Sequence, residues 1–200
     1  MVPTGLIYAF VLAVIGYILG IFTNPWAALP FYVLAAFCLW FFRDPDRAIP
    51  QGPVAVSPAD GKVVLIKSLP EGMRVSIFLN IFDVHVNRSP IAGKLIAVDY
   101  TKGKFLVASK ESASFENERN TFTVEGEGTR ITFSQIAGLI ARRIVSYKKQ
   151  GDYVTRGERV GLIKFGSRVD VLFGPEWEIA VREGQHVAAG SSVLARRKDA

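Results

Sequence analysis

Three short segments of this 200-residue sequence hold most of its chemically reactive side chains. One residue stands out in each: Asp60 beside Gly61, His85 after an apolar run, and Ser167 after Gly166. Taken singly, each has an ordinary structural explanation, as a turn-stabilising carboxylate, a histidine at a strand end and a Gly-Ser bulge. The sequence has no Gly-x-Ser-x-Gly elbow, so it gives no support for a hydrolase. The segments are residues 57–63 (SPADGKV), 82–90 (FDVHVNRSP) and 164–171 (KFGSRVDV).

The sequence lacks the residues for a metal centre or a disulfide framework. Its one cysteine is Cys38, inside an apolar block, and its two histidines, His85 and His186, are far apart in the chain. Zinc sites and disulfide scaffolds need several such ligands at close spacing. We therefore expect no metal.

The first 42 residues read as a membrane anchor. They contain no charged side chain and no histidine, so all 24 basic and 18 acidic residues lie beyond Phe42. Gly5–Phe22 is an uninterrupted apolar run of a length that can span a bilayer. A polar turn at residues 23–25 separates it from a second run, Trp26–Phe42, which either spans or lies re-entrant against the first. Such a block excludes an all-soluble protein, a disordered chain and a multi-span transporter.

Charges around the block predict its orientation. Arg43 and Arg47 follow the second run directly, and short basic flanks favour the cytoplasmic side. We expect a helical hairpin with both ends in the cytoplasm. The alternatives are a hairpin buried in a soluble fold and a signal peptide, although no basic residue precedes the run and no clean cleavage site follows it.

The net charge of +6 belongs to the part of the chain after the anchor. Its basic clusters could meet anionic lipid head groups or form an ordinary solvated surface. No nucleic-acid-reading motif is present, so we expect no nucleic-acid partner. The clusters are Arg142-Arg143, Lys148-Lys149 and residues 196–198.

Beyond Phe42 the sequence predicts a mainly β domain, residues 43–200. Short β-branched runs recur every eight to twelve residues with Gly and Pro between them, which is typical of a sandwich or barrel. Leu139–Tyr147 is also predicted as a strand, because Ile144 and Val145 are β-branched. The other predicted strands are Val63–Ile66, Arg74–Leu79, Leu95–Tyr100, Thr121–Val124, Arg130–Ser134, Val169–Phe173 and Trp177–Val181.

Two internal repeats support this architecture. Residues 57–63 recur as residues 89–95, with Asp60 replaced by Ala92, and residues 151–157 recur as residues 184–190. The second pattern, Gly-x-x-Val-x-x-Gly before an apolar strand, resembles the turns of biotinyl/lipoyl-type hybrid barrels. It places His186 where the first copy has a tyrosine, so we interpret His186 as a turn residue.

Taken in order, five motifs resemble the phosphatidylserine decarboxylase proenzymes, closest to short forms with a hydrophobic N-terminal anchor. The resemblance runs from about Phe41 to Ala195. Its motifs are residues 41–47 (FFRDPDR), 57–63 (SPADGKV), 83–90 (DVHVNRSP), 116–120 (ENERN) and 151–167 (GDYVTRGERVGLIKFGS).

The resemblance implies that the chain cuts itself between Gly166 and Ser167. The Ser167 hydroxyl would attack the Gly166 carbonyl, with His85 as base and Asp60 orienting the imidazole. Elimination and loss of ammonia would leave chain 1–166 and chain 167–200, the latter starting with a pyruvoyl group. The two chains together would form the enzyme.

The resemblance also implies the decarboxylation chemistry. The pyruvoyl group would form a Schiff base with phosphatidylserine at the membrane and act as an electron sink as carbon dioxide leaves, giving phosphatidylethanolamine. Many relatives carry a second histidine where this chain has Arg88, so His85 would serve both cleavage and protonation, with Asp83 assisting. Arg88 and Arg168, which follows the processing serine in place of the usual threonine, would hold the phosphate or carboxylate of the head group.

Several alternatives stay open at this stage. The same machinery could act on a related serine phospholipid, such as an archaeal ether lipid. A membrane-tethered carrier domain modified on Lys164 is a different class of protein, but the usual Met-Lys-Met context is absent. A relative that no longer processes itself is a third class, against which the joint presence of Asp60, His85 and Ser167 argues. The sequence leaves acyl-chain preference and homo-oligomer formation open.

Overall fold

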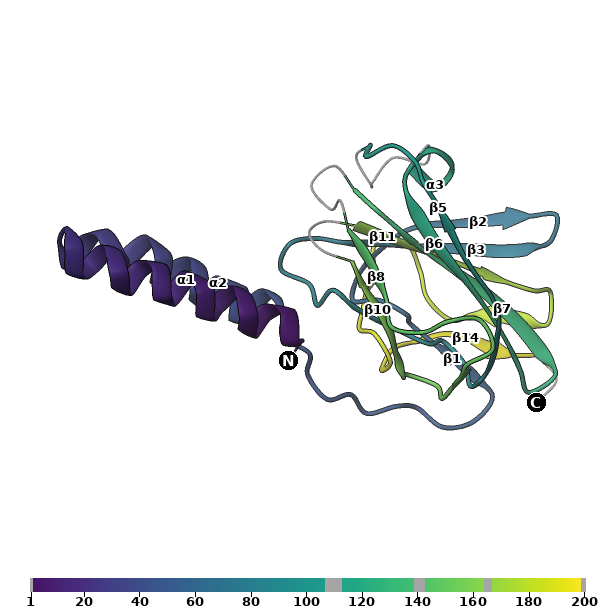
Figure 1. The fold of residues 1–200 in the computed structure, drawn as a ribbon. Coiled ribbons are helices and arrows are strands. Elements are labelled where there is room, and N and C mark those ends of the chain that lie inside the picture. Colours follow the sequence, from purple (N-terminus) through teal and green to yellow (C-terminus); the bar gives the residue numbers. More distant parts are fainter. Residues whose placement is uncertain (1, 107–112, 139–142, 164–166, 199–200) are drawn as a thin grey trace. The chain divides into compact units, whose positions relative to one another are not determined.

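A computed structural model describes residues 2–106, 113–138, 143–163 and 167–198. The chain divides into two compact units, Met1–Asp46 and Arg47–Ala200 (Figure 1). The predicted cleavage residue Gly166, the alternative modification site Lys164, Arg142 of the first basic pair and residues 139–142 of one predicted strand lie outside the described residues.

The first unit is a hairpin of apolar helices. Helix α1 (Pro3–Phe22) and helix α2 (Leu29–Phe41) are joined by a short 3₁₀ turn, η1 (Pro25–Ala28), in which the Asn24 side chain accepts the Ala27 N–H at 3.2 Å. The helices pack closely because α1 presents a glycine to α2: a Cβ on Gly16 would lie 2.9 Å from the Cβ of Phe31. The predicted helical hairpin is confirmed.

Helix α1 is the one helix among the described residues that is long and apolar enough to cross a membrane. At 20 residues it measures about 30 Å, the thickness of a bilayer's hydrocarbon core. Large apolar side chains on the unit are solvent-facing, including Phe10 at 71% and Trp26 at 80% exposure. Helix α2, with 13 residues, measures about 20 Å and is too short to span alone.

The second unit is mainly β, as predicted. Its largest sheet has eight antiparallel strands in the order β13-β2-β3-β11-β7-β6-β5-β9, and two three-stranded sheets, β1-β14-β12 and β4-β10-β8, complete it (Figure 1). The strands are β1 (Val54–Val56), β2 (Gly61–Leu69), β3 (Gly72–Leu79), β4 (Val86–Arg88), β5 (Gly93–Thr101), β6 (Arg119–Gly126), β7 (Thr129–Ile136), β8 (Ile144–Ser146), β9 (Tyr153–Val154), β10 (Arg159–Ile163), β11 (Ser167–Phe173), β12 (Trp177–Ile179), β13 (His186–Val187) and β14 (Val193–Arg197), with a short helix α3 (Ala113–Glu116).

Strand β11 occupies the middle of the large sheet, between β3 and β7. Its alternate residues Val169, Val171 and Phe173 are fully buried in the hydrophobic core. Because side chains alternate along a strand, Arg168, Asp170 and Leu172 lie on the opposite face. The fold thus runs the predicted processing strand through the centre of the domain.

The two sequence repeats are structural repeats with matching hydrogen bonds. The Ser57 hydroxyl donates to Ala59 O at 2.6 Å, and that of Ser89 donates to Ile91 O at 2.7 Å. Gly157 N–H bonds Ser89 O, and Gly190 N–H bonds Ser57 O, both at 2.8 Å. The first repeat therefore opens hairpins β2–β3 and β5–β6, and the second supplies their edge strands β13 and β9.

Glycine begins both hairpins because the neighbouring strand comes too close for a side chain. Gly61 has φ +140°, and a Cβ there would lie 2.2 Å from Phe78 O. At Gly93 the corresponding distance, to Glu125 O, is 2.4 Å. No L-residue fits such a contact without moving the backbone.

Each of the seven strands predicted first overlaps an observed strand, and β8 lies within the predicted Leu139–Tyr147 segment. Strand β3 ends at Leu79 as predicted, because the side chains of Asn80 and Asp83 cap a turn there. Strand β12 ends at Ile179 rather than Val181.

Candidate active site

Ser167 is the first residue of β11 and pairs with Leu79, the last residue of β3. Its side chain is fully buried, and its Oγ has no hydrogen-bond partner among the described residues. Buried hydroxyls are normally satisfied, because leaving one without a partner costs about 1–3 kcal/mol. An exception of this kind is the type of feature found at reactive groups.

His85 is held rigidly at the same end of the sheet. Its Nδ1 lies 2.9 Å from the carbonyl oxygen of Asp83, and the residue is 1% exposed. A carbonyl only accepts, so Nδ1 carries the proton in this bond, and in a neutral ring Nε2 is the basic nitrogen. The histidine therefore has a defined tautomer suited to taking a proton at Nε2.

The turn Asn80–Asp83 positions His85. The Asp83 carboxylate accepts the Asn80 N–H at 2.8 Å, and the Asn80 side chain accepts the Phe82 N–H at 2.7 Å. After the turn, His85 O accepts the N–H of Ile163 at 3.2 Å, at the end of β10.

Ser167 and His85 are thereby brought to one end of the domain. Ile163 and Ser167 lie on either side of residues 164–166 in the sequence. The N–H of Ile163 bonds His85 O, and Ser167 pairs with Leu79, the last residue before the turn that leads to His85. Asp83 contributes its backbone oxygen, which bonds His85 Nδ1, while its carboxylate accepts the Asn80 N–H within the turn.

Asp60 has a different set of partners. Both of its oxygens accept from Arg47 Nη2, at 3.0 and 2.8 Å, and Oδ1 also accepts the Ala189 N–H at 2.7 Å. The two side chains are 14% and 15% exposed, so this ion pair is largely shielded from water. Within the described residues, the hydrogen bonds of Asp60 go to Arg47 and Ala189 and none to His85.

Arg47 is the site residue that sequence reasoning missed. It lies in the first of the five family motifs, and the sequence indicated only that its charge flanks the anchor. The sequence feature that points to such a partner is that Asp60 has no counterpart in the other copy of its repeat, where Ala92 stands. A carboxylate added to one copy needs a partner that the repeat itself does not supply.

A chain of buried amides connects the loop of Asp60 with the strand of His85. Asn120 donates to Gln135 Oε1 at 3.3 Å, Gln135 donates to Asn87 Oδ1 at 2.8 Å, and Asn87 donates to Pro58 O at 3.4 Å. Asn87 lies two residues after His85, and Pro58 two residues before Asp60. All three amide side chains are at most 3% exposed. The network therefore fixes the two loops relative to each other.

The two predicted substrate-binding arginines are both buried. Arg88 donates from Nη1 to Gly157 O at 3.0 Å. Arg168 donates from Nε to Asp170 Oδ1 at 2.6 Å and from Nη2 to the Ser76 hydroxyl at 2.7 Å. Strand alternation places Arg168 on the face of the sheet opposite Ser167. Arg168 thus has a structural ion pair inside the sheet.

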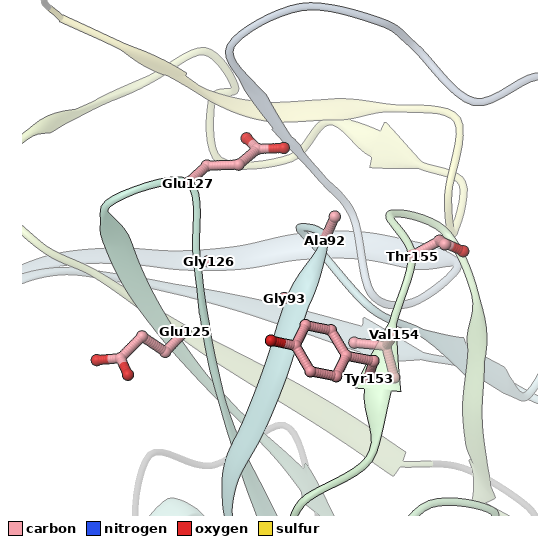
Figure 2. A pocket seen from close by; sticks show the side chains of 8 residues that line it. All are labelled: Ala92, Gly93, Glu125, Gly126, Glu127, Tyr153, Val154 and Thr155. Atoms are coloured by element: carbon pink, nitrogen blue, oxygen red, sulfur yellow. The ribbon is translucent and has the colours of Figure 1, made fainter.

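One hollow of the domain is lined by none of these residues. It has a volume of about 490 Å³ and is found at the sheet edge formed by β5 and β9 (Figure 2). By the internal repeat it corresponds to the Asp60 end of the domain, but with Ala92 in the carboxylate's place. Its lining residues are Ala92, Gly93, Glu125, Gly126, Glu127, Tyr153, Val154 and Thr155.

His186 is exposed and begins strand β13, where it pairs with Lys62. Its interpretation as a turn residue is therefore wrong, because the turn ends before it and the chain there pairs with the edge of β2. Across the described ranges, no group of three or more His, Cys, Asp or Glu side chains is placed to hold a metal ion.

Comparison with known proteins gives a consistent result. A sequence model of the family described as phosphatidylserine decarboxylase matches residues 34–195. A protein of Solibacter usitatus, named phosphatidylserine decarboxylase proenzyme, is 62% identical over 201 residues, covering 100% of this chain and 98% of its own. Proteins of the same name from Magnetococcus marinus and Novosphingobium aromaticivorans are 46% and 50% identical, each over 84% of this chain and over 81% and 75% of their own lengths.

Proposed function

Because this chain belongs to the phosphatidylserine decarboxylase family, we propose that it is a self-processing enzyme that converts phosphatidylserine to phosphatidylethanolamine and carbon dioxide. The observation that carries the proposal is the match along the full chain to a proenzyme of that name. A self-processing proenzyme must contain a group that cuts it, and a buried serine and an ordered histidine at the same end of the domain support the proposal.

The surroundings of Ser167 suit a serine that is converted to a pyruvoyl group. Its Oγ is fully buried without a partner in the described part of the chain, so no existing hydrogen bond holds it back from reaction. Once formed, the group would supply an electrophilic carbonyl that accepts electrons as carbon dioxide leaves.

In the proposed cleavage, Ser167 Oγ bonds to the carbonyl carbon of Gly166 while the Gly166–Ser167 peptide C–N bond breaks, leaving an ester and a free amine. His85 Nε2 takes the hydroxyl proton, since Nδ1 is occupied with Asp83 O. Elimination then breaks the Ser167 Cβ–O bond and leaves Gly166 with a carboxylate. Water then replaces the nitrogen of residue 167, and this nitrogen leaves as ammonia.

Asp60 is proposed to orient His85 during this step, by analogy with other triads. Both Asp60 oxygens are engaged by Arg47 in the structure, so the carboxylate would have to release one of these bonds to reach the imidazole. Arg47 would then keep its bond to the other carboxylate oxygen.

Arg88 and Arg168 are the two arginines proposed to hold the head group. Arg88 is bonded to Gly157 O, and Arg168 is bonded to Asp170 and Ser76, so either side chain would exchange one of these bonds for the substrate's phosphate or carboxylate. A planar guanidinium suits both the phosphate and the carboxylate of phosphatidylserine.

We place the enzyme in the membrane, with residues 1–42 as its anchor and residues 43–200 as its decarboxylase domain. The apolar, outward-facing helix α1 supports this, and the arginines that follow α2 favour a cytoplasmic catalytic domain.

The decisive test is Ser167→Ala. The variant should remain one uncut chain without decarboxylase activity, while the parent protein gives chain 1–166 and a 34-residue chain with a blocked N-terminus. Ser167→Thr and Ser167→Cys, which retain a nucleophile, should still cut slowly. Intact mass spectrometry distinguishes these products. Efficient cleavage of Ser167→Ala would disprove the assignment.

A further inference from the structure

The turn that positions His85 has an unusual sequence for an exposed turn. Its central residues are Ile81 and Phe82, and they are 41% and 68% exposed. Gly, Asn, Asp, Pro and Ser dominate such positions, because each satisfies or tolerates turn geometry at little cost in water. Two large apolar side chains at the tip of a tight turn therefore call for a surface that covers them.

The turn holds these side chains outward in a fixed arrangement. Besides the two side-chain bonds that cap it, the Asp83 N–H donates to Asn80 O at 3.1 Å, closing the turn. Ile81 and Phe82 thus lie on a backbone whose shape is set by Asn80 and Asp83. Little ordering entropy would be lost when they bind a surface.

The turn lies at the catalytic end of the domain. It begins one residue after Leu79, the register partner of Ser167, and it ends two residues before His85. Arg143 is exposed and directly precedes Ile144 in the sequence. Ile144 pairs with Ile163, whose N–H bonds His85 O, so this part of the chain leads to the same end of the domain. An apolar tip at an end of the domain that also has an exposed basic residue is a combination that suits an anionic lipid surface.

We infer that Ile81 and Phe82 form a membrane-contact tip that inserts into an anionic phospholipid bilayer and brings Ser167 and His85 to the lipid head groups. The inference rests on the proposed function, because a lipid substrate is presented at a bilayer surface. The tip is separate from the anchor of residues 1–42: the anchor keeps the protein at the membrane, and the tip sets the orientation of the active site.

The test uses full-length, matured enzyme in phosphatidylcholine vesicles. Decarboxylation is measured on long-chain phosphatidylserine in the same bilayer and on a short-chain, monomeric phosphatidylserine added in solution. The variant Ile81→Ser/Phe82→Ser should lose about tenfold on bilayer substrate, because burying one such side chain is worth at least a factor of ten. Its rate on the monomeric substrate and its extent of self-cleavage should stay within about twofold of the parent.

Two matched variants accompany it. Ile81→Leu/Phe82→Leu keeps the apolar surface and should retain the bilayer rate. Tyr153→Ser removes another exposed aromatic, 76% exposed at the β9 edge, and should leave all rates unchanged.

Several outcomes would overturn the inference. An equal loss on both substrates would show that the turn supports the chemistry rather than the bilayer contact. An unchanged bilayer rate would show that the tip touches no lipid, and a bilayer loss accompanied by a change in oligomeric mass would assign the tip to a second copy of the chain. If the parent enzyme decarboxylated neither substrate, the proposed function itself would fail.

Discussion

At the scale of single residues, burial separates the reactive groups of this protein from their ordinary counterparts. Ser167 and His85 are both shielded from water, yet only His85 has its hydrogen bonds arranged in advance. A shielded base with a fixed tautomer and a hydroxyl without a partner in the described part of the chain are the two groups that nucleophilic attack requires. The structure thereby supplies what the residue types alone could not, which is order in one group and availability in the other.

The first prediction separates Asp60 from His85. Asp60→Asn should slow self-cleavage strongly, by analogy with orienting carboxylates, where the same change costs about 10⁴-fold. The fraction that does mature should decarboxylate at a near-normal rate for each pyruvoyl group, because orientation for cleavage is no longer needed. His85→Ala that has matured should be slower by about 10²–10⁴-fold, through loss of a general acid.

Both rates are measured after the pyruvoyl content has been titrated with a carbonyl reagent, which corrects for incomplete maturation. Full normalised activity in matured His85→Ala would remove His85 from the decarboxylation step and leave Asp83 or solvent as the acid. A low normalised rate in matured Asp60→Asn would show that the Arg47–Asp60 pair also serves the second reaction.

The residue types at the site could be predicted from the sequence, but their pairing could not. Asp60, His85 and Ser167 stand in recognisable motifs, whereas the Arg47–Asp60 ion pair joins two different motifs and depends on the path of the chain after the anchor. The opposite orientations of Ser167 and Arg168 follow from strand alternation, which becomes informative only once Ser167 is known to lie within a strand.

At the scale of secondary-structure elements, long strands were predictable and short ones were not. Strands such as β3 and β11 have enough alternating or apolar residues to show a pattern. Strands β9 and β13 have two residues each and exist only because β5 and β2 lie beside them. Their existence is a tertiary effect, although the repeated glycine turns pointed to the places where they lie.

The amide chain provides a second prediction, at the level of contacts between elements. Gln135→Leu should lower the free energy of unfolding by about 1–3 kcal/mol for each buried group left without its partner, namely Asn87 Oδ1 and Asn120 Nδ2. Thr123→Val is the control, because it removes the 3.1 Å bond with Thr132 at a partly exposed place in the same sheet. It should cost less than 1 kcal/mol, on the order of a single solvated hydrogen bond.

Urea unfolding of both variants in the uncut Ser167→Ala background gives these values for a single chain. Because the amide chain also links the loops of Asp60 and His85, Gln135→Leu in the processing-competent chain should cut itself more slowly than Thr123→Val. Equal cleavage rates for the two variants would limit the amide chain to a role in stability.

At the scale of the whole molecule, a third prediction concerns the two units. Protease added to intact cells should leave the decarboxylase domain untouched, because basic residues after α2 favour the cytoplasmic side. Digestion there would reverse the proposed topology. Deleting residues 1–42 should release the domain into solution and impair access to bilayer substrate, while self-cleavage remains, since Arg47 and every other site residue are retained.

The place of β11 has a consequence for how the mature enzyme is built. Residues 167–200 contribute one of the two central strands of the eight-stranded sheet, β11, and the middle strand of the β1-β14-β12 sheet, β14. Before cleavage these strands find their neighbours as parts of one molecule, at a cost in loop entropy that grows only slowly with length. After cleavage, an unfolded enzyme is two separate molecules, and its recovery would depend on their concentration. The uncut chain would then be needed to reach the native state before cleavage. After cleavage, the native state would persist because the barrier to unfolding is high.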